Sequence, residues 1–138
     1  MHIVICGSMS CATEMLAIRK QLVTMGHSVT IPVGTEDYQN GVLISTHGSE
    51  SAQRKITFNF IRGYAAEIQH SDAILVVNVT RNQIENYIGG NTFWEIGFAH
   101  IFGRKIFLLN PIPDVPLYKS EILAVEPVIL NGDLSKIT

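Results

Sequence analysis

Short apolar runs alternate along the chain with longer stretches in which apolar residues recur at helical spacing. The apolar runs, which predict strands, are residues 2–6, 29–31, 73–79, 105–109 and 128–130. The stretches that predict helices are residues 10–25, 55–70, 92–103 and 118–124, with a further small helix at the C-terminus. Strands that alternate with helices predict an α/β fold. We expect five strands in a mainly parallel sheet, in the order 2-1-3-4-5, with helices on both faces.

The pattern also indicates where helices begin and which faces they bury. Ser10 is expected to cap the first helix and Gly26 to end it. Its predicted buried stripe is Met15, Ile18, Leu22 and Met25, and that of the helix over 55–70 is Ile61, Tyr64, Ala65 and Ile68. Two polar stretches, residues 33–54 and 80–91, lack periodicity and are expected to be loops. The first is long enough to suggest a mobile binding loop.

Composition narrows the class of protein. The 138 residues predict one domain over residues 1–138, and 46% hydrophobic with 16% charged residues is typical of a globular chain. A net charge of −2 gives no case for nucleic-acid binding, and no apolar run is long enough to span a membrane. No leader is recognisable, so a cytoplasmic location is the default expectation. Cys6 and Cys11 have no second pair, so their spacing does not indicate a metal site.

The stretch from Ile88 to His100 carries the most chemistry. Two glycines, Gly89 and Gly90, precede a helix expected to begin at about Thr92, which places Glu95 in its first turn. There the free backbone N–H groups and the helix dipole favour an ionised carboxylate, which could act as a nucleophile. The alternative is that Thr92-x-x-Glu95 is a capping box, in which the glutamate only accepts a backbone hydrogen bond.

Parallel strands bring their carboxyl ends to one edge of the sheet, where ligands bind in such folds. Four segments are expected to meet there: residues 7–10, 33–54, 80–95 and 110–113. Glu95 is therefore expected to face a ligand crevice, and Asn110 is a candidate for contact with substrate.

Three motifs together resemble the nucleoside 2-deoxyribosyltransferase superfamily, which includes the small deoxynucleoside 5′-monophosphate N-glycosidases. They are the segments Ile3-Val4-Ile5-Cys6-Gly7-Ser8-Met9, Ser71-Asp72-Ala73-Ile74-Leu75-Val76-Val77 and Gly90-Asn91-Thr92-Phe93-Trp94-Glu95-Ile96-Gly97-Phe98-Ala99. The resemblance covers roughly residues 3–110 and implies a flavodoxin-like, Rossmann-like sheet, commonly in a homodimer with the site near the subunit interface.

The resemblance also implies roles for particular residues. Glu95 would attack the anomeric carbon of the sugar. Substrate would be bound by the first turn, with Gly7, Ser8 and Met9, and near the 5′ end of the sugar by Gly89, Gly90 and Asn91.

One position departs from the family pattern. The family carries an aspartate, associated with proton handling at the base, eight residues before the aspartate that opens the third strand. Tyr64 occupies that position here, and its ordinary pKa near 10 suits it poorly to the role. Glu67, three residues on, is the candidate to replace it. The loop between Val79 and Gly89 is also longer than in the small glycosidases.

Two functions therefore stay open: cleavage or transfer at an N-glycosidic bond of a nucleoside or nucleotide, and binding of such a molecule without chemistry. The intact context of Glu95 favours the first, and Tyr64 favours the second. No cofactor is expected, because residues 7–12 lack the dinucleotide fingerprint and no P-loop occurs. The many aromatic residues on the helices over 55–70 and 92–103 predict a homodimer.

Overall fold

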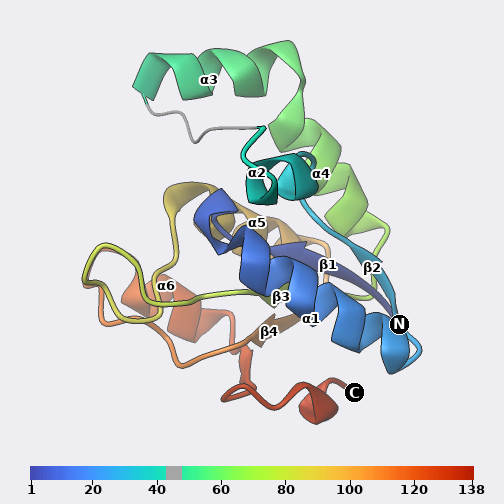
Figure 1. Ribbon diagram of the computed structural model, residues 1–138. Coiled ribbons are helices and arrows are strands. Elements are labelled where there is room, and N and C mark those ends of the chain that lie inside the picture. Colours follow the sequence, from blue (N-terminus) through green and yellow to red (C-terminus); the bar gives the residue numbers. More distant parts are fainter. Residues whose placement is uncertain (43–47) are drawn as a thin grey trace.

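A five-stranded sheet with strand order β2-β1-β3-β4-β5 forms the centre of the computed structural model, which describes residues 1–42 and 48–138 (Figure 1). The strands are β1 (His2–Cys6), β2 (Ser28–Thr30), β3 (Ala73–Val76), β4 (Lys105–Leu108) and β5 (Val128–Ile129). All four pairings are parallel. The predicted α/β class and strand order are confirmed.

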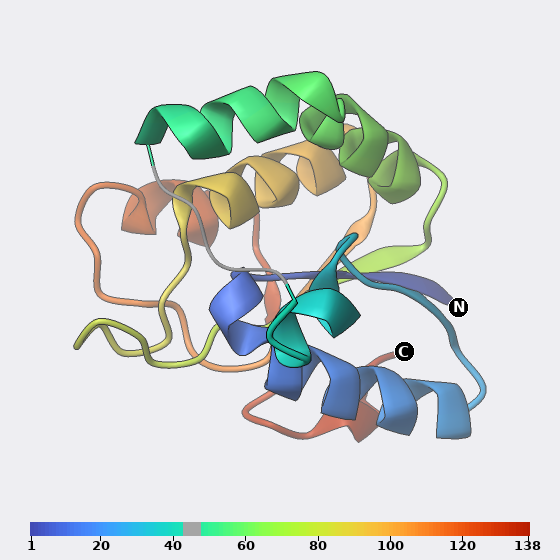
Figure 2. The same ribbon diagram turned by 45° about the horizontal axis from the view of Figure 1, so that its top comes forward.

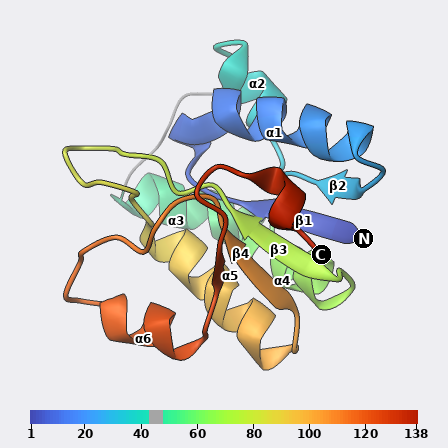
Figure 3. The same ribbon diagram turned by 90° about the horizontal axis from the view of Figure 1, so that it is seen from below.

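The central strands β1, β3 and β4 are largely buried on both faces, as their continuous hydrophobic runs predicted, whereas the edge strands β2 and β5 are partly exposed. Ile3 and Ile5 of β1 pack on the face that α1 (Ala12–Thr24) covers. Val4 and Cys6 point the opposite way, toward α4 (Phe60–Gln69), α5 (Gly90–Ile101) and α6 (Lys119–Ala124). Figure 3 shows α1 on one side of the sheet and these three helices on the other. The core is therefore two apolar layers separated by the sheet.

The first helix differs from its predicted form at both ends. A short 3-10 helix, η1 (Met9–Cys11), precedes α1, and Ser8 caps it by accepting a hydrogen bond from the backbone N–H of Ser10. Ser10 is therefore not the cap. Met25 was expected in the buried stripe, but it is 44% exposed because α1 ends before it.

The expectation that residues 33–54 form a loop is wrong for most of that stretch. It contains α2 (Thr35–Gln39) and the start of α3 (Gly48–Thr57), and residues 43–47 lie outside the described part. An ion pair between Arg19 and Glu36, 2.8 Å long, ties α2 to α1. None of the α3 residues is buried, and the helix lies away from the sheet in Figures 1 and 2. Apart from Ala52 and Ile56, the residues of α3 are polar or glycine, so the apolar stripe that predicts a buried helix is short.

The single helix predicted over residues 55–70 is two helices, α3 and α4. The break falls at Asn59, whose φ of 52° is left-handed and incompatible with a continuous helix. Ile68 is buried, but Ile61 is 40% exposed because it lies at the first turn of α4, away from the sheet.

The rest of the chain completes the fold. A second 3-10 helix, η2 (Leu134–Lys136), packs Leu134 against the α1 face of the sheet. Within the described residues, no helix combines the length and the apolar character that a membrane crossing requires.

Candidate active site

A cavity of about 1380 Å³ opens at the carboxyl edge of the sheet. It is bounded by the turn after β1, by the segment around α2, by α3 with the start of α4, and by the loop that leads into α5. The predicted site residues that line it are Gly7, Ser8, Met9, Gly89, Gly90, Asn91 and Glu95. The structure therefore gathers residues from distant parts of the sequence around one space.

Glu95 lies in the second turn of α5, not in the first. Gly89 is the N-cap residue and Gly90 the first helical residue, so Thr92 cannot cap and the first turn contains no acidic residue. The capping-box interpretation is therefore wrong. The Glu95 side chain instead accepts a hydrogen bond from its neighbour one turn earlier, with Asn91 Nδ2 3.0 Å from Oε1. Only 6% of Glu95 is exposed.

The electrostatics of Glu95 also differ from the prediction of a carboxylate held ionised. Burial raises its pKa from 4.5 to about 8, although a hydrogen bond from the Cys6 thiol and the positive charge of Lys55 lower it. At pH 7 roughly a tenth of such a group is ionised. A strongly perturbed carboxyl group that borders a cavity is a common feature of catalytic sites.

The Tyr64 hydroxyl is hydrogen-bonded to the backbone. It donates to the carbonyl of Ile5 at 2.5 Å. Burial raises the pKa of Tyr64 well above 10, and the nearby Cys6, Glu95 and Glu67 raise it further. Tyr64 lines a neighbouring apolar cavity of about 480 Å³ that also borders Glu95.

Glu67 lies one turn beyond Tyr64 on α4 and is exposed. It lines the smaller cavity but not the larger one. The suggestion that Glu67 takes the place of the family's aspartate stays a prediction.

The turn after β1, with Gly7, Ser8 and Met9, lines the cavity and is closely packed against its neighbours. A Cβ atom at Gly7 would lie 3.3 Å from the carbonyl oxygen of Val77 and 3.5 Å from the sulfur of Met15. The Thr35 hydroxyl, which donates to the carbonyl of Pro32 at 2.6 Å, lies 3.9 Å from the sulfur of Met9, so this turn contacts the start of α2. A larger residue at position 7 would therefore displace the turn.

Asn110 was predicted to contact substrate, but it does not line either cavity. Its backbone N–H donates to Asn78 Oδ1 at 2.9 Å, and its own side chain donates to the carbonyl of Asn78 at 3.0 Å. The Asn78 amide donates in turn to the carbonyls of Asn110 and Pro111. The pair joins the ends of β3 and β4, so Asn110 has a structural role.

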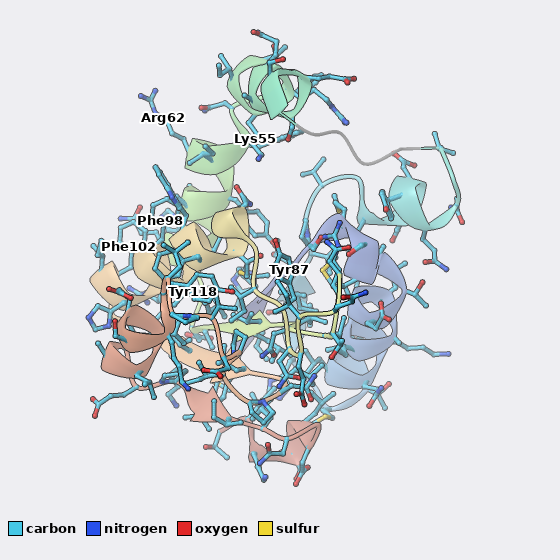
Figure 4. All side chains as sticks on the ribbon, turned by 90° about the vertical axis from the view of Figure 1, so that its left-hand side faces the viewer. Lys55, Arg62, Tyr87, Phe98, Phe102 and Tyr118 are labelled. Atoms are coloured by element: carbon cyan, nitrogen blue, oxygen red, sulfur yellow. The ribbon has the colours of Figure 1, made fainter. Side chains whose placement is uncertain are left out.

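Sequence reasoning assigned no role to the basic residues around the cavity. Arg54, Lys55, Arg62 and Arg81 all line it. In Figure 4, Lys55 lies beneath α3, on the side that faces the rest of the molecule, whereas Arg62 points outward from α4. The basic residues come from separate elements, so no basic run in the sequence indicated them.

Comparison with known proteins found solved structures that resemble this one. No protein-family model matches the chain, and no curated protein matches it in sequence. It is similar to the structure of a 2-deoxyribosyltransferase from Bacillus psychrosaccharolyticus, with 18% identity and a TM-score of 0.45 over 78% of this chain and 71% of that one. It is also similar to the Clostridium botulinum CMP N-glycosidase BcmB, with 14% identity and a TM-score of 0.49 over 95% of this chain and 90% of that one.

Proposed function

We propose that this protein cleaves or transfers at the N-glycosidic bond of a nucleoside or nucleotide, with Glu95 as the nucleophile. The observation that carries the proposal is the buried Glu95 carboxyl group. It borders a large cavity at the carboxyl edge of a parallel sheet, and an amide from Asn91 orients it. Burying a carboxyl group is costly, and α5 would be more stable with an apolar residue there. We therefore infer that a carboxyl group stands at position 95 because the function requires it.

The chemistry follows from that position. The ionised Glu95 oxygen attacks the anomeric carbon, a carbon–oxygen bond forms, and the bond to the base nitrogen breaks. The base leaves with the bonding electrons and takes a proton from water in the cavity. Water or a second nucleobase then attacks the same carbon, gives its proton to the hydroxide that the first step left, and releases Glu95 as a carboxylate. The apolar surroundings that raise the pKa of Glu95 also make its ionised form a stronger nucleophile, since that form is poorly solvated.

Assay of free base tests this proposal. The protein is incubated with the four common 2′-deoxynucleosides and their 5′-monophosphates, and released base is measured by chromatography. Release of base from at least one of them is expected. Binding without release would favour the second candidate below.

The second candidate is a binding module, and the position of Tyr64 favours it. Because its hydroxyl proton is engaged by the Ile5 carbonyl, no side-chain acid in the family position is available to protonate a leaving base. The same cavity would then hold a nucleoside or nucleotide for sensing or regulation.

Replacing Tyr64 by phenylalanine distinguishes a structural role from a catalytic one. We expect the Tyr64→Phe variant to lose about 1 kcal/mol of unfolding free energy, because the hydrogen bond to Ile5 is removed, and to release base at nearly the parent rate. Denaturant unfolding and the base-release assay measure the two effects. A loss of about a hundredfold or more in turnover would instead mark Tyr64 as the proton donor.

The homodimer expected from the sequence remains a proposal, which exposed aromatic side chains support. Phe93 stacks on Tyr118 at 5.3 Å, so α6 covers it within the chain, and Figure 4 shows Tyr118 beside Phe98 and Phe102. By contrast, Phe58 is 62% and Trp94 59% exposed. Light scattering at micromolar concentration is expected to give twice the 15.3 kDa mass of one chain. A monomer would refute the proposal.

A further inference from the structure

Two charged side chains, Lys55 and Glu95, line both the larger and the smaller cavity, and no other charged residue in the described part of the chain does so. Lys55 lies in the last turn of α3, is half-buried, and is on the side of that helix that faces the rest of the molecule (Figure 4). Glu95 lies on α5. A ligand that extends from one cavity into the other therefore passes between an ammonium group and a carboxyl group.

The positive charge of Lys55 is close to Glu95 but not paired with it. The two ion pairs found within residues 1–42 and 48–138 involve other cations and other carboxylates. The charge of Lys55 nevertheless lowers the pKa of Glu95, so the two groups interact across the space between them. An ammonium group carries three N–H donors, which suit an acceptor atom of a ligand seated in that space.

Cleavage of a glycosidic bond needs two groups that flank the bond. One attacks the sugar carbon, and the other gives a proton to the atom that leaves. With Glu95 as the nucleophile, the proton donor belongs on the opposite side of the anomeric carbon, next to the base. Lys55 meets this requirement, because it borders the same two cavities from a different helix.

The other titratable groups around the cavities fit the role of donor less well. The Tyr64 hydroxyl already donates to the carbonyl of Ile5. The guanidinium groups of the three arginines that line the larger cavity do not release protons in proteins. Glu67 lines the smaller cavity only. Water is a far weaker acid than an ammonium group. Lys55 is therefore the donor that the arrangement favours.

We propose that Lys55, in place of water, is the proton donor to the leaving base, a role that rests on the proposed function. As the bond between the anomeric carbon and the base nitrogen breaks, the base keeps the bonding electrons and takes a proton from the Lys55 ammonium group, which becomes a neutral amine. The water or second nucleobase that then attacks the sugar carbon gives its proton to that amine, and Glu95 is released as a carboxylate. Both groups thus return to their starting states.

The dependence of the rate on the leaving base tests the proposal. The substrates are two pairs, each supplied as nucleosides and as 5′-monophosphates: 2′-deoxyguanosine with its N7-methyl derivative, and 2′-deoxyuridine with 5-fluoro-2′-deoxyuridine. The N7-methyl base leaves as a neutral molecule without an added proton, and fluorouracil is a more stable anion than uracil. We expect Lys55→Met to lower release of the unmodified base about a hundredfold and release of the modified base by less than about tenfold.

Further variants separate proton donation from charge. Lys55→Arg keeps the charge, but a guanidinium is a poor acid, so it should show the same dependence on the leaving base as Lys55→Met. An effect through the ionisation of Glu95 alone would instead be equal for both members of a pair and absent in Lys55→Arg. Added methylammonium should restore release in Lys55→Ala, measured on every substrate that the parent cleaves, because it supplies the missing amine.

The matched control is Lys20→Met, which makes the same change on the exposed side of α1, outside both cavities. It should release every base at the parent rate. Circular dichroism establishes that each variant is folded. Release by Lys55→Met that equals that of the parent, or that falls equally for both members of a pair, would overturn the proposal. So would the expected dependence on the leaving base if it appeared in Glu67→Gln and not in Lys55→Met.

Glu95→Gln in the same assay separates this inference from the proposed function. Loss of release in Glu95→Gln, with Lys55→Met unchanged, would support the nucleophile and overturn the role of Lys55. Release by Glu95→Gln at the parent rate, with the expected dependence in Lys55→Met, would support Lys55 and overturn Glu95 as the nucleophile. A parent protein that releases no base from any of these substrates or from the common 2′-deoxynucleosides would overturn both.

Discussion

Replacing Glu95 by glutamine is expected to lower base release by three or more orders of magnitude, on the order of the loss that follows removal of a catalytic nucleophile. Glutamine has nearly the same shape and still places an oxygen where Asn91 Nδ2 can donate. The fold and the affinity for substrate should therefore be retained. The base-release assay measures turnover and calorimetric titration measures affinity, each on the parent protein and on Glu95→Gln.

The matched control is Glu14→Gln, which makes the same chemical change on the exposed side of α1, outside both cavities. It is expected to leave turnover unchanged. Turnover in Glu95→Gln close to that of the parent would eliminate Glu95 as the nucleophile, whatever the substrate proves to be.

The second large effect is on stability, and it depends on pH. Glu95 has a pKa of about 8 in the folded protein and near 4.5 in the unfolded chain, so the folded state binds more protons between these two values. The stabilisation from the protonated carboxyl is fully present below about pH 4.5 and is lost as the pH rises through 8. The slope from this group alone is up to about 1.4 kcal/mol per pH unit.

Glutamine does not titrate, so the unfolding free energy of the Glu95→Gln variant does not fall for this reason as the pH rises. We expect it to match the parent in unfolding free energy near pH 5 and to exceed it by a few kcal/mol, as an order of magnitude, at pH 8. Urea unfolding of both proteins from pH 5 to 8.5 measures the difference, in which other titrating groups cancel. A difference that stays constant across this range would mean that the burial of Glu95 does not shift its pKa.

Much of the fold follows from local sequence, because the central strands are continuous apolar runs that only a doubly covered sheet can bury. Glycines at the ends of helices also acted as predicted, and Gly26 has the left-handed φ of 91° that ends α1. The element that failed most clearly was α3, which is mostly polar and has only Ala52 and Ile56 as an apolar pair at helical spacing.

The sequence indicated several of the segments that border the larger cavity, but not the environment of Glu95 or the place of Asn110 outside both cavities. Thr92 and Glu95 have capping-box spacing, yet the extended backbone at Gly89 starts the helix three residues earlier than that box requires. The ionisation of Glu95 depends on the surroundings that Cys6, Tyr64 and the rest of α5 form around it, which spacing cannot reveal.

A covalent intermediate on Glu95 is the central claim, and mass spectrometry of the protein tests it most directly. The parent protein is quenched in acid during turnover of a nucleoside 5′-monophosphate, digested, and searched for the peptide that contains Glu95. The account predicts that this peptide carries the mass of the sugar phosphate without its base, and that the same peptide from Glu95→Gln does not. Base release that proceeds with the sugar attached to another residue would contradict the account.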